Sequence, residues 1–268
     1  MGFLTLTWGL GWPVMKLALA EMGPWNFRTL CLILGGALIL LIAKARGISL
    51  GIPKGELAPL LVVAGVNVTG WNLLSAYGVI LLQAGRAAIL AYTMPLWAAV
   101  LGRLVLGERL NATRLAGLAL GLCGLAVLMG HEVSAMGRAP GGALLMLGAA
   151  LSWALGTVLI KRRSWQMGTE VFAGWQLILG GMPVLVGTVL LEPPFWCAGI
   201  SLRGSLAVGY VIVVGVVLGY WGWLKVVEIF PVTIASLGTL AVPAIGMLSS
   251  GILLGEPVGW RELVSLGL

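Results

Sequence analysis

The stretch Trp153-Ala154-Leu155-Gly156, followed by Lys161, repeats an earlier stretch of the same chain. The earlier copy is Trp8-Gly9-Leu10-Gly11, followed by Lys16, and the offset between the copies is 145 residues. Self-similarity at a fixed period indicates a duplicated architecture. The chain is therefore expected to contain two structurally related halves.

Further matches extend the repeat over most of the chain. They are Phe27 with Phe172, Leu32-Ile33-Leu34-Gly35-Gly36 with Leu177-Ile178-Leu179-Gly180-Gly181, Pro95 with Pro243, and Leu106-Gly107-Glu108 with Leu254-Gly255-Glu256. The last two pairs stand at an offset of 148, so about three residues are inserted between the matching pieces. We expect the first repeat over residues 1–130 and the second over residues 142–268.

The composition predicts an integral membrane protein. Hydrophobic residues make up 60% of the chain, charged residues only 9%, and there is no Asp, whereas soluble domains average about 25% charged residues. The net charge of +7 comes from short connectors, which is typical of a cytoplasmic membrane face rather than of nucleic-acid binding. The three cysteines, Cys31, Cys123 and Cys197, lack metal or redox spacing, so no metal or cofactor is expected.

The apolar segments predict ten transmembrane helices, because a span needs about 20 apolar residues. We place them near 2–20, 25–43, 57–80, 86–106, 114–130, 142–160, 170–191, 205–227 and 232–254, with the tenth beginning near 260. The tenth helix is too short to span before Leu268, so we expect that it is truncated here.

The distribution of basic residues predicts the topology. Most of them, including Lys161-Arg162-Arg163, fall in connectors on the side of the N-terminus, which favours a cytoplasmic N-terminus. The expected location is a bacterial inner (plasma) membrane. Five helices per repeat is an odd number, so the second repeat is inverted relative to the first. The predicted fold class is an all-α membrane protein of two inverted five-helix repeats, an architecture that transporters use.

These features resemble the EamA family of the drug/metabolite transporter superfamily. The resemblance rests on Trp-x-Leu-Gly in the first helix of each half, Pro95 and Pro243 in the fourth, and Leu-Gly-Glu at the end of the fourth. The helices rich in Trp and Tyr are most similar to YddG-type exporters of aromatic amino acids. The resemblance implies a central cavity lined by helices 1, 3, 4, 6, 8 and 9 and opened alternately to either side.

Aromatic residues at mid-membrane depth are the first candidates for substrate contact. An indole N–H cannot be satisfied by hydrocarbon, so such a residue should face protein or a cavity. The candidates on helices assigned to the cavity are Trp8, Trp12, Trp71, Tyr92, Trp97, Trp153, Tyr220 and Trp221. Helix packing explains any one of them equally well, but as a set they favour contact with a substrate.

Asn67 is the polar candidate, because its spacing of four from Trp71 and of eight from Ser75 predicts one shared helix face. An amide in the membrane is costly unless it meets a polar group or a substrate. A hydrogen bond between helices is an equally good explanation. Lys16 and Arg28 lie near the outer ends of the first two helices, where snorkelling to headgroups is favoured over attraction of a substrate carboxylate.

Pro95 and Pro243 fall inside the fourth helix of each half. A proline removes a backbone hydrogen bond and kinks the helix, and the freed carbonyls are available to a substrate ammonium. We predict that the two prolines form the kinks, and the pivots, of the conformational change. A kink that serves packing alone is the alternative.

The leading hypothesis is an exporter of small amphiphilic metabolites, above all aromatic and hydrophobic amino acids, working by alternating access through an aromatic-lined cavity between the repeats. The alternatives are a transporter of phosphorylated or nucleotide-linked compounds, which requires Arg or Lys in the cavity, or of cationic drugs. No carboxylate is expected at mid-membrane, so facilitated export is a simpler hypothesis than proton coupling.

Other classes of function fit less well. An intramembrane enzyme is not expected, because the single His131 falls in a connector and no nucleophile–base pair can be assembled. A purely structural subunit does not need Trp and Asn at mid-depth. The expected partners are a small-molecule substrate and membrane lipid, without nucleic acid, and the expected state is a monomer or weak homodimer.

Overall fold

The computed structural model describes residues 2–81, 87, 90–109, 111–129, 140–193 and 199–254, and the regular structure of these residues is entirely helical. A bilayer offers backbone groups no hydrogen-bond partner, and a helix satisfies them within the segment. The first half contains α1 (Gly2–Leu19), α2 (Pro24–Ala45), α3 (Leu57–Val63), η1 (Ala64–Gly70), α4 (Trp71–Leu81), α6 (Met94–Leu106) and α7 (Ala112–Met129). The second half contains α9 (Pro140–Arg162), α10 (Thr169–Leu191), α11 (Leu202–Tyr210), η3 (Val211–Leu218), α12 (Gly219–Ile229), α13 (Val232–Leu237) and α14 (Val242–Leu254).

Six helical stretches of the described residues are long and apolar enough to cross a membrane. They are Pro24–Ala45, Leu57–Gly78, Pro140–Arg162, Thr169–Leu191, Leu202–Ile229 and Val232–Leu253. The predicted first, fourth and fifth spans correspond to α1, α6 and α7, which are 18, 13 and 18 residues long. The predicted tenth span lies outside the described residues. The structure thus confirms the all-helical fold class and six spans of the ten predicted.

A π-helical segment interrupts the third helix of the first half and its counterpart in the second. These segments, η1 and η3, begin at Ala64 and Val211, at an offset of 147 that lies between the two offsets of the sequence repeat. Hydrogen bonds in a π-helix reach from residue i to residue i+5, so the turn is wider than in an α-helix. Side chains four residues apart therefore do not stay on one face across these segments.

Each predicted hinge proline follows a break in its helix. Pro95 stands in the first turn of α6, after turn residues 92 and 93. Pro243 stands in the first turn of α14, after the turn at 238–241 that separates α13 from α14. The first turn tolerates proline, because the missing N–H would have no helical partner there. The sequence predicted kinks inside continuous helices, whereas the structure interrupts the helices; the role as pivots stays a prediction.

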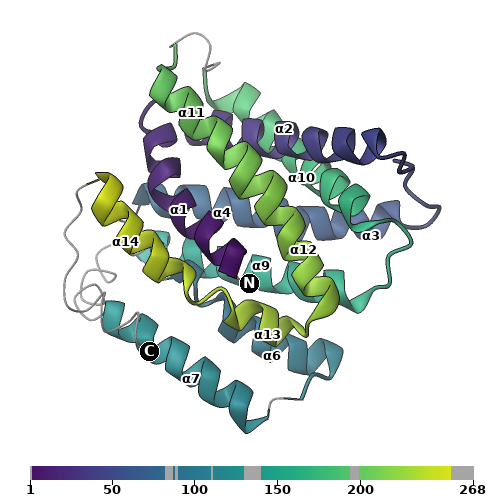
Figure 1. Ribbon diagram of the computed structural model, residues 1–268, viewed down its shortest axis with the longest axis vertical. Helices are drawn as coiled ribbons and strands as arrows, with labels where there is room; N and C mark the ends of the chain where they lie inside the picture. The colour runs from purple at the N-terminus through teal and green to yellow at the C-terminus, as the bar shows by residue number, and fades with distance from the viewer. Residues whose placement is uncertain are drawn as a thin grey trace.

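The most extensive contact between the two halves joins α2 to its repeat counterpart α10, which lies beside it (Figure 1). Gly36 of α2 lies against Gly174 and Leu177, while Leu32 lies against Gly181. The residue numbers in these contacts rise along α2 as they fall along α10, so the two helices run antiparallel. A Cβ atom on Gly36 would lie 2.9 Å from the carbonyl oxygen of Gly174. The absence of a side chain at Gly36 is therefore what permits this approach.

A buried hydrogen-bond network joins four segments near this contact. Asn67 of η1 donates through Nδ2 to the carbonyl oxygen of Trp153 in α9, at 3.1 Å. Its Oδ1 accepts from the Tyr220 hydroxyl of α12 at 2.8 Å and from Nε2 of Gln176 in α10 at 3.3 Å. Asn67 and Gln176 are both 0% exposed. We call these four residues the Asn67 network; it links the first half to three helices of the second.

The remaining helices surround this centre (Figure 1). Helices α4 and α6 pack against α9, and α1 packs against α14 and α11. Helix α7 lies at the edge of the bundle, where it contacts α13.

Replacing Gly36 with alanine should destabilise the protein. The new methyl group would also lie 2.8 Å from Ile178 Cγ1, and overpacking of this kind costs about 1–3 kcal/mol. We expect the thermal unfolding midpoint of the detergent-solubilised protein to fall by several degrees. Gly209→Ala is the matched control, because nothing lies within 4 Å of its Cβ position. Equal midpoints for the two variants would contradict the close approach of α2 and α10.

Removing the Asn67 side chain should also lower stability. Asn67→Ala leaves the Tyr220 hydroxyl and the Gln176 amide buried without an acceptor, at a cost of about 1–3 kcal/mol. Tyr220→Phe removes only the hydroxyl and allows a double-mutant cycle. We expect Tyr220→Phe to cost less in the Asn67→Ala background than in the wild type. Additive losses of unfolding free energy would show that this hydrogen bond contributes nothing.

Candidate functional site

A cavity of about 180 Å³ lies at the centre of the bundle, in the half nearer the turn between α1 and α2. Its lining residues come from both repeats: Thr7, Trp8, Gly11, Trp12, Met15, Arg28, Leu32, Val68, Trp71, Asn72, Tyr92, Met94, Trp153, Leu177, Val211, Gly215, Val216 and Tyr220. Sites for drug-sized ligands usually measure about 300–1,000 Å³. The cavity is therefore suited to one small metabolite.

Five aromatic residues cluster at the end of the cavity that lies deepest in the bundle. Trp153 is at their centre, with ring centroids 5.3 Å from Trp71, 5.8 Å from Trp223, 6.0 Å from Trp8 and 6.2 Å from Tyr220. The rings meet edge to face or tilted, which are favourable arrangements of aromatic quadrupoles. We call these five residues the aromatic floor. Four of them line the cavity, and Trp223 is fully buried behind them.

Hydrogen bonds fix the aromatic side chains of α1. The indole N–H of Trp8 donates to the carbonyl oxygen of Gly215 at 3.1 Å, within the π-helical segment η3. The indole N–H of Trp12 donates to the Tyr92 hydroxyl at 3.2 Å, with the ring centroids 6.3 Å apart. Trp8, Gly11, Trp12 and Met15 share the face of α1 that lines the cavity, as helical spacing requires. These hydrogen bonds hold both Trp side chains of α1 in place at the cavity.

Six of the nine residues predicted to bind substrate line the cavity: Trp8, Trp12, Trp71, Tyr92, Trp153 and Tyr220. The other three lie elsewhere. Asn67 is fully buried in its network, and Trp97 packs beside Ala154 and Val158 of α9. Trp221 donates its indole N–H to Glu170 at 3.2 Å, at the opposite end of the bundle. Trp223, two residues further on, occupies the aromatic floor instead.

The π-helical segment explains why Asn67 is displaced from the cavity. The α-helical spacing of Asn67, Trp71 and Ser75 predicts that they share one face, but η1 ends between Asn67 and Trp71. The wider turn rotates Asn67 toward α9 and α10, while Trp71 and Asn72 face the cavity. The hydrogen bond between helices, which the sequence left as an equal alternative, is the role that the structure gives Asn67.

Sequence reasoning missed several lining residues, among them Asn72, Met15 and Thr7. Met15 lies one turn from Trp12 on α1, and that spacing was available in the sequence; Thr7 is one turn from Gly11, which carries no side chain to mark the face. Asn72 had no such signal, because it depends on the π-helical register. Arg28 was favoured as a residue that snorkels to lipid headgroups, yet it lines the cavity.

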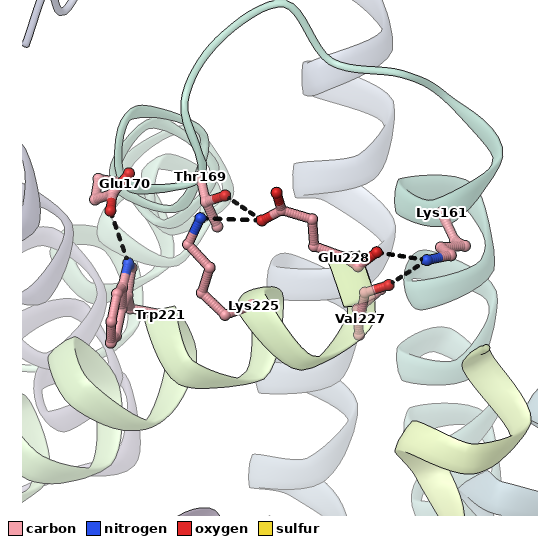
Figure 2. Close-up of polar contacts among 7 residues, drawn as sticks. All are labelled: Lys161, Thr169, Glu170, Trp221, Lys225, Val227 and Glu228. Atoms are coloured by element: carbon pink, nitrogen blue, oxygen red, sulfur yellow. Dashed lines mark hydrogen bonds and ion pairs between the residues drawn. The ribbon is translucent and has the colours of Figure 1, made fainter. Parts of the chain in front are cut away.

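On the other side of the aromatic floor, polar contacts tie the helix ends together, as Figure 2 shows. Lys161 of α9 donates to the carbonyl oxygens of Val227 and Glu228 at 2.8 Å each, satisfying carbonyls at the end of α12. The Glu228 carboxylate accepts from Thr169 at 2.7 Å and pairs with Lys225 at 3.1 Å. We call Lys161, Thr169, Lys225 and Glu228 the polar clasp.

Two further features mark this end of the bundle. A second hollow of about 330 Å³ lies beside the clasp, between Lys161, Trp165 and Glu228. The Glu108 carboxylate accepts from the backbone N–H of Val232 at 2.7 Å and from the Thr233 hydroxyl at 2.8 Å, and so caps α13. Such contacts tie the helices together at this end, while the central cavity lies toward the other.

The chain is similar to several bacterial transporters. It is 31% identical to the uncharacterized transporter YvbV of Bacillus subtilis, over 99% of this chain and 86% of that protein. It is 28% identical to a probable amino-acid metabolite efflux pump of Salmonella typhimurium, over 98% of this chain and 89% of that protein. A solved crystal structure with 24% identity superposes with a TM-score of 0.81, covering 98% of this chain and 91% of the other, and so shares the fold.

A model of the EamA-like transporter family matches residues 2–130 and 140–268. The two matches fall on the two halves of the sequence repeat, and the central cavity lies between residues of both. The chain is an integral membrane protein that belongs to the EamA-like transporter family.

Proposed function

We propose that this protein exports small amphiphilic metabolites, with aromatic and other hydrophobic amino acids as the first substrates. The aromatic floor carries the proposal. Four of its rings, those of Trp8, Trp71, Trp153 and Tyr220, line a cavity whose volume of about 180 Å³ suits one such molecule. Rings around a mostly apolar site bind the flat side chain of an aromatic amino acid by stacking and burial.

The similarity to proteins named as amino-acid metabolite efflux pumps, in Salmonella typhimurium and Escherichia coli, agrees with this substrate class. Among the described residues, no Glu lines the cavity. A cationic drug would lack a carboxylate partner there. Facilitated export is therefore proposed rather than coupling to a carboxylate in the cavity.

The full architecture that we propose has ten transmembrane helices in two inverted five-helix repeats, over residues 1–130 and 142–268. The antiparallel course of the matching helices α2 and α10 supports inversion. With a cytoplasmic N-terminus in a bacterial inner membrane, the polar clasp faces the cytoplasm and the cavity lies in the outer half. The described arrangement is then the outward-facing state of an alternating-access cycle, in which the helix breaks before Pro95 and Pro243 serve as pivots.

Phosphorylated substrates are the second candidate, and one observation favours them. A phosphate needs a cation in the cavity, and Arg28 is the single Lys or Arg that lines it among the described residues. A phosphate monoester at neutral pH carries about 1.5–2 negative charges, which one guanidinium only partly balances. The amino-acid assignment is therefore preferred.

Transport by the purified protein in proteoliposomes tests the assignment. We expect uptake of radiolabelled tryptophan and phenylalanine without a pH gradient, and little uptake of threonine or a sugar phosphate.

Trp71→Ala removes one ring of the floor and should raise the half-saturating tryptophan concentration roughly ten-fold, since burial of a large apolar side chain is worth about 1.5–3 kcal/mol. Trp175→Ala is the control, because this half-buried Trp lies outside the cavity. Transport of the sugar phosphate alone would refute the proposal.

Weakening the polar clasp should favour opening at its end of the bundle. Lys161→Met removes two hydrogen bonds to α12. Thr157, 1% exposed and between the floor and the clasp, is the reporter position. With the native cysteines replaced by alanine, a membrane-impermeant maleimide should label the Thr157→Cys variant several-fold faster when Lys161→Met is present. Arg162→Met is the matched control, and an unchanged rate would show that Lys161 does not hold this end closed.

A further inference from the structure

Arg28 is the charged residue of the cavity that the proposed function leaves unexplained. It projects from α2, four residues after the helix begins at Pro24, and is partly buried. Its guanidinium lies 5.6 Å from the ring centroid of the neighbouring Phe27. Within the described part of the chain it has no hydrogen bond and no ion pair. Its guanidinium therefore lines the cavity as a cation that no described protein group pairs with, and burying such a group further would be costly.

The described carboxylates at the same end of the bundle, Glu21 and Glu192, bond to other groups rather than to Arg28. Glu21 accepts from the hydroxyl of Ser201 at 2.6 Å and from its backbone N–H at 2.7 Å. Glu192 accepts from the backbone N–H of Asn26 at 3.0 Å and from its side-chain amide at 2.9 Å. Both carboxylates serve the beginnings of helices, where negative charge is stabilised. Neither of these carboxylates pairs with Arg28, so its guanidinium is available to a molecule bound in the cavity.

The cavity is polarised along its length. Trp8 lies eleven residues from the end of α1 and Arg28 lies four residues from the start of α2, so at 1.5 Å per residue the two differ in depth by about 10 Å. Leu32, one turn further along α2, and Val216 of η3 provide apolar lining. The cavity thus offers rings at one end and a guanidinium at the other.

We propose that Arg28 binds the anionic head of the transported molecule, and that the substrates are aryl or alkyl carboxylates, including amino acids. The inference rests on the proposed function, because it takes the cavity to be the substrate site. A guanidinium presents parallel N–H donors that match the two oxygens of a carboxylate. The aromatic floor selects the apolar body, and Arg28 excludes amines that lack a carboxylate.

Ligand binding to the purified protein in nanodiscs tests this assignment, using four probes with comparable aromatic bodies. L-tryptophan carries both charged groups, indole-3-propionate only the carboxylate, tryptamine only the ammonium, and phenyl phosphate the alternative anion. Calorimetry measures each affinity for the wild type and for Arg28→Gln, Arg28→Lys and Arg203→Gln. Arg203 is a matched control, because it is an exposed cation at the start of α11, outside the cavity.

We expect the wild type to bind tryptophan and indole-3-propionate at least ten-fold more tightly than tryptamine. Arg28→Gln should weaken binding of both carboxylates by ten-fold to a hundred-fold, as expected for hydrogen bonds between charged groups. Binding of tryptamine should not change. Arg28→Lys should recover part of the loss, and Arg203→Gln should behave as the wild type. The preference of the wild type for carboxylates needs no variant, so it tests the assignment even if Arg28→Gln fails to fold.

The other outcomes separate this inference from the proposed function. If tryptamine binds the wild type as tightly as tryptophan, or if Arg28→Gln weakens the binding of all probes equally, Arg28 does not recognise the carboxylate. The proposed export of aromatic compounds would still stand. If indole-3-propionate binds through Arg28 but tryptophan does not, the inference stands and the amino-acid assignment is wrong. Binding of phenyl phosphate alone, or of no probe, contradicts both.

Discussion

The close approach of α2 and α10 is the constraint on which the rest of the structure depends. Gly36 and Gly174 bring the two backbones near enough that a methyl group would collide with a carbonyl oxygen. At that separation Gln176 of α10 reaches Asn67 of η1, and Asn67 in turn holds the backbone of Trp153. A pair of glycines in the helix contact thus sets the position of the residue at the centre of the aromatic floor.

The aromatic floor divides the bundle into two ends with different chemistry. Toward the turn between α1 and α2 lies an apolar cavity with one cation, and toward the ends of α9 and α12 lies the polar clasp. In an alternating-access transporter, a few contacts at one end of the bundle can bias the equilibrium between two states of similar energy. The π-helical segments η1 and η3 flank the cavity, and Gly215 in η3 accepts the bond from Trp8; local π-helical turns are often found at functional sites.

Much of the aromatic lining of the cavity could be predicted from the sequence, because it follows from the depth of each residue in its helix and from the internal repeat. Trp8 and Trp153 are equivalent positions of the repeat, so one argument placed both at mid-membrane, and both line the cavity. The position of Asn67 outside the cavity could not be predicted, since α-helical spacing does not hold across η1 and no pattern in the sequence indicates the π-helical turn. Trp221 and Trp223 lie at the same depth and differ only in the face of α12 that they occupy, so composition could not choose between them. Arg28 lies near a helix end, where the sequence is compatible with contact to lipid or to the cavity. Which of the two contacts it makes depends on how the helices pack.

The space between Trp153 and Arg28 is the proposed substrate site, and a structure of the protein determined with saturating L-tryptophan tests this most directly. We expect the indole against Trp8, Trp71 and Trp153 and the carboxylate at Arg28. Tryptophan found instead in the hollow beside the polar clasp, with the central cavity empty, would contradict it.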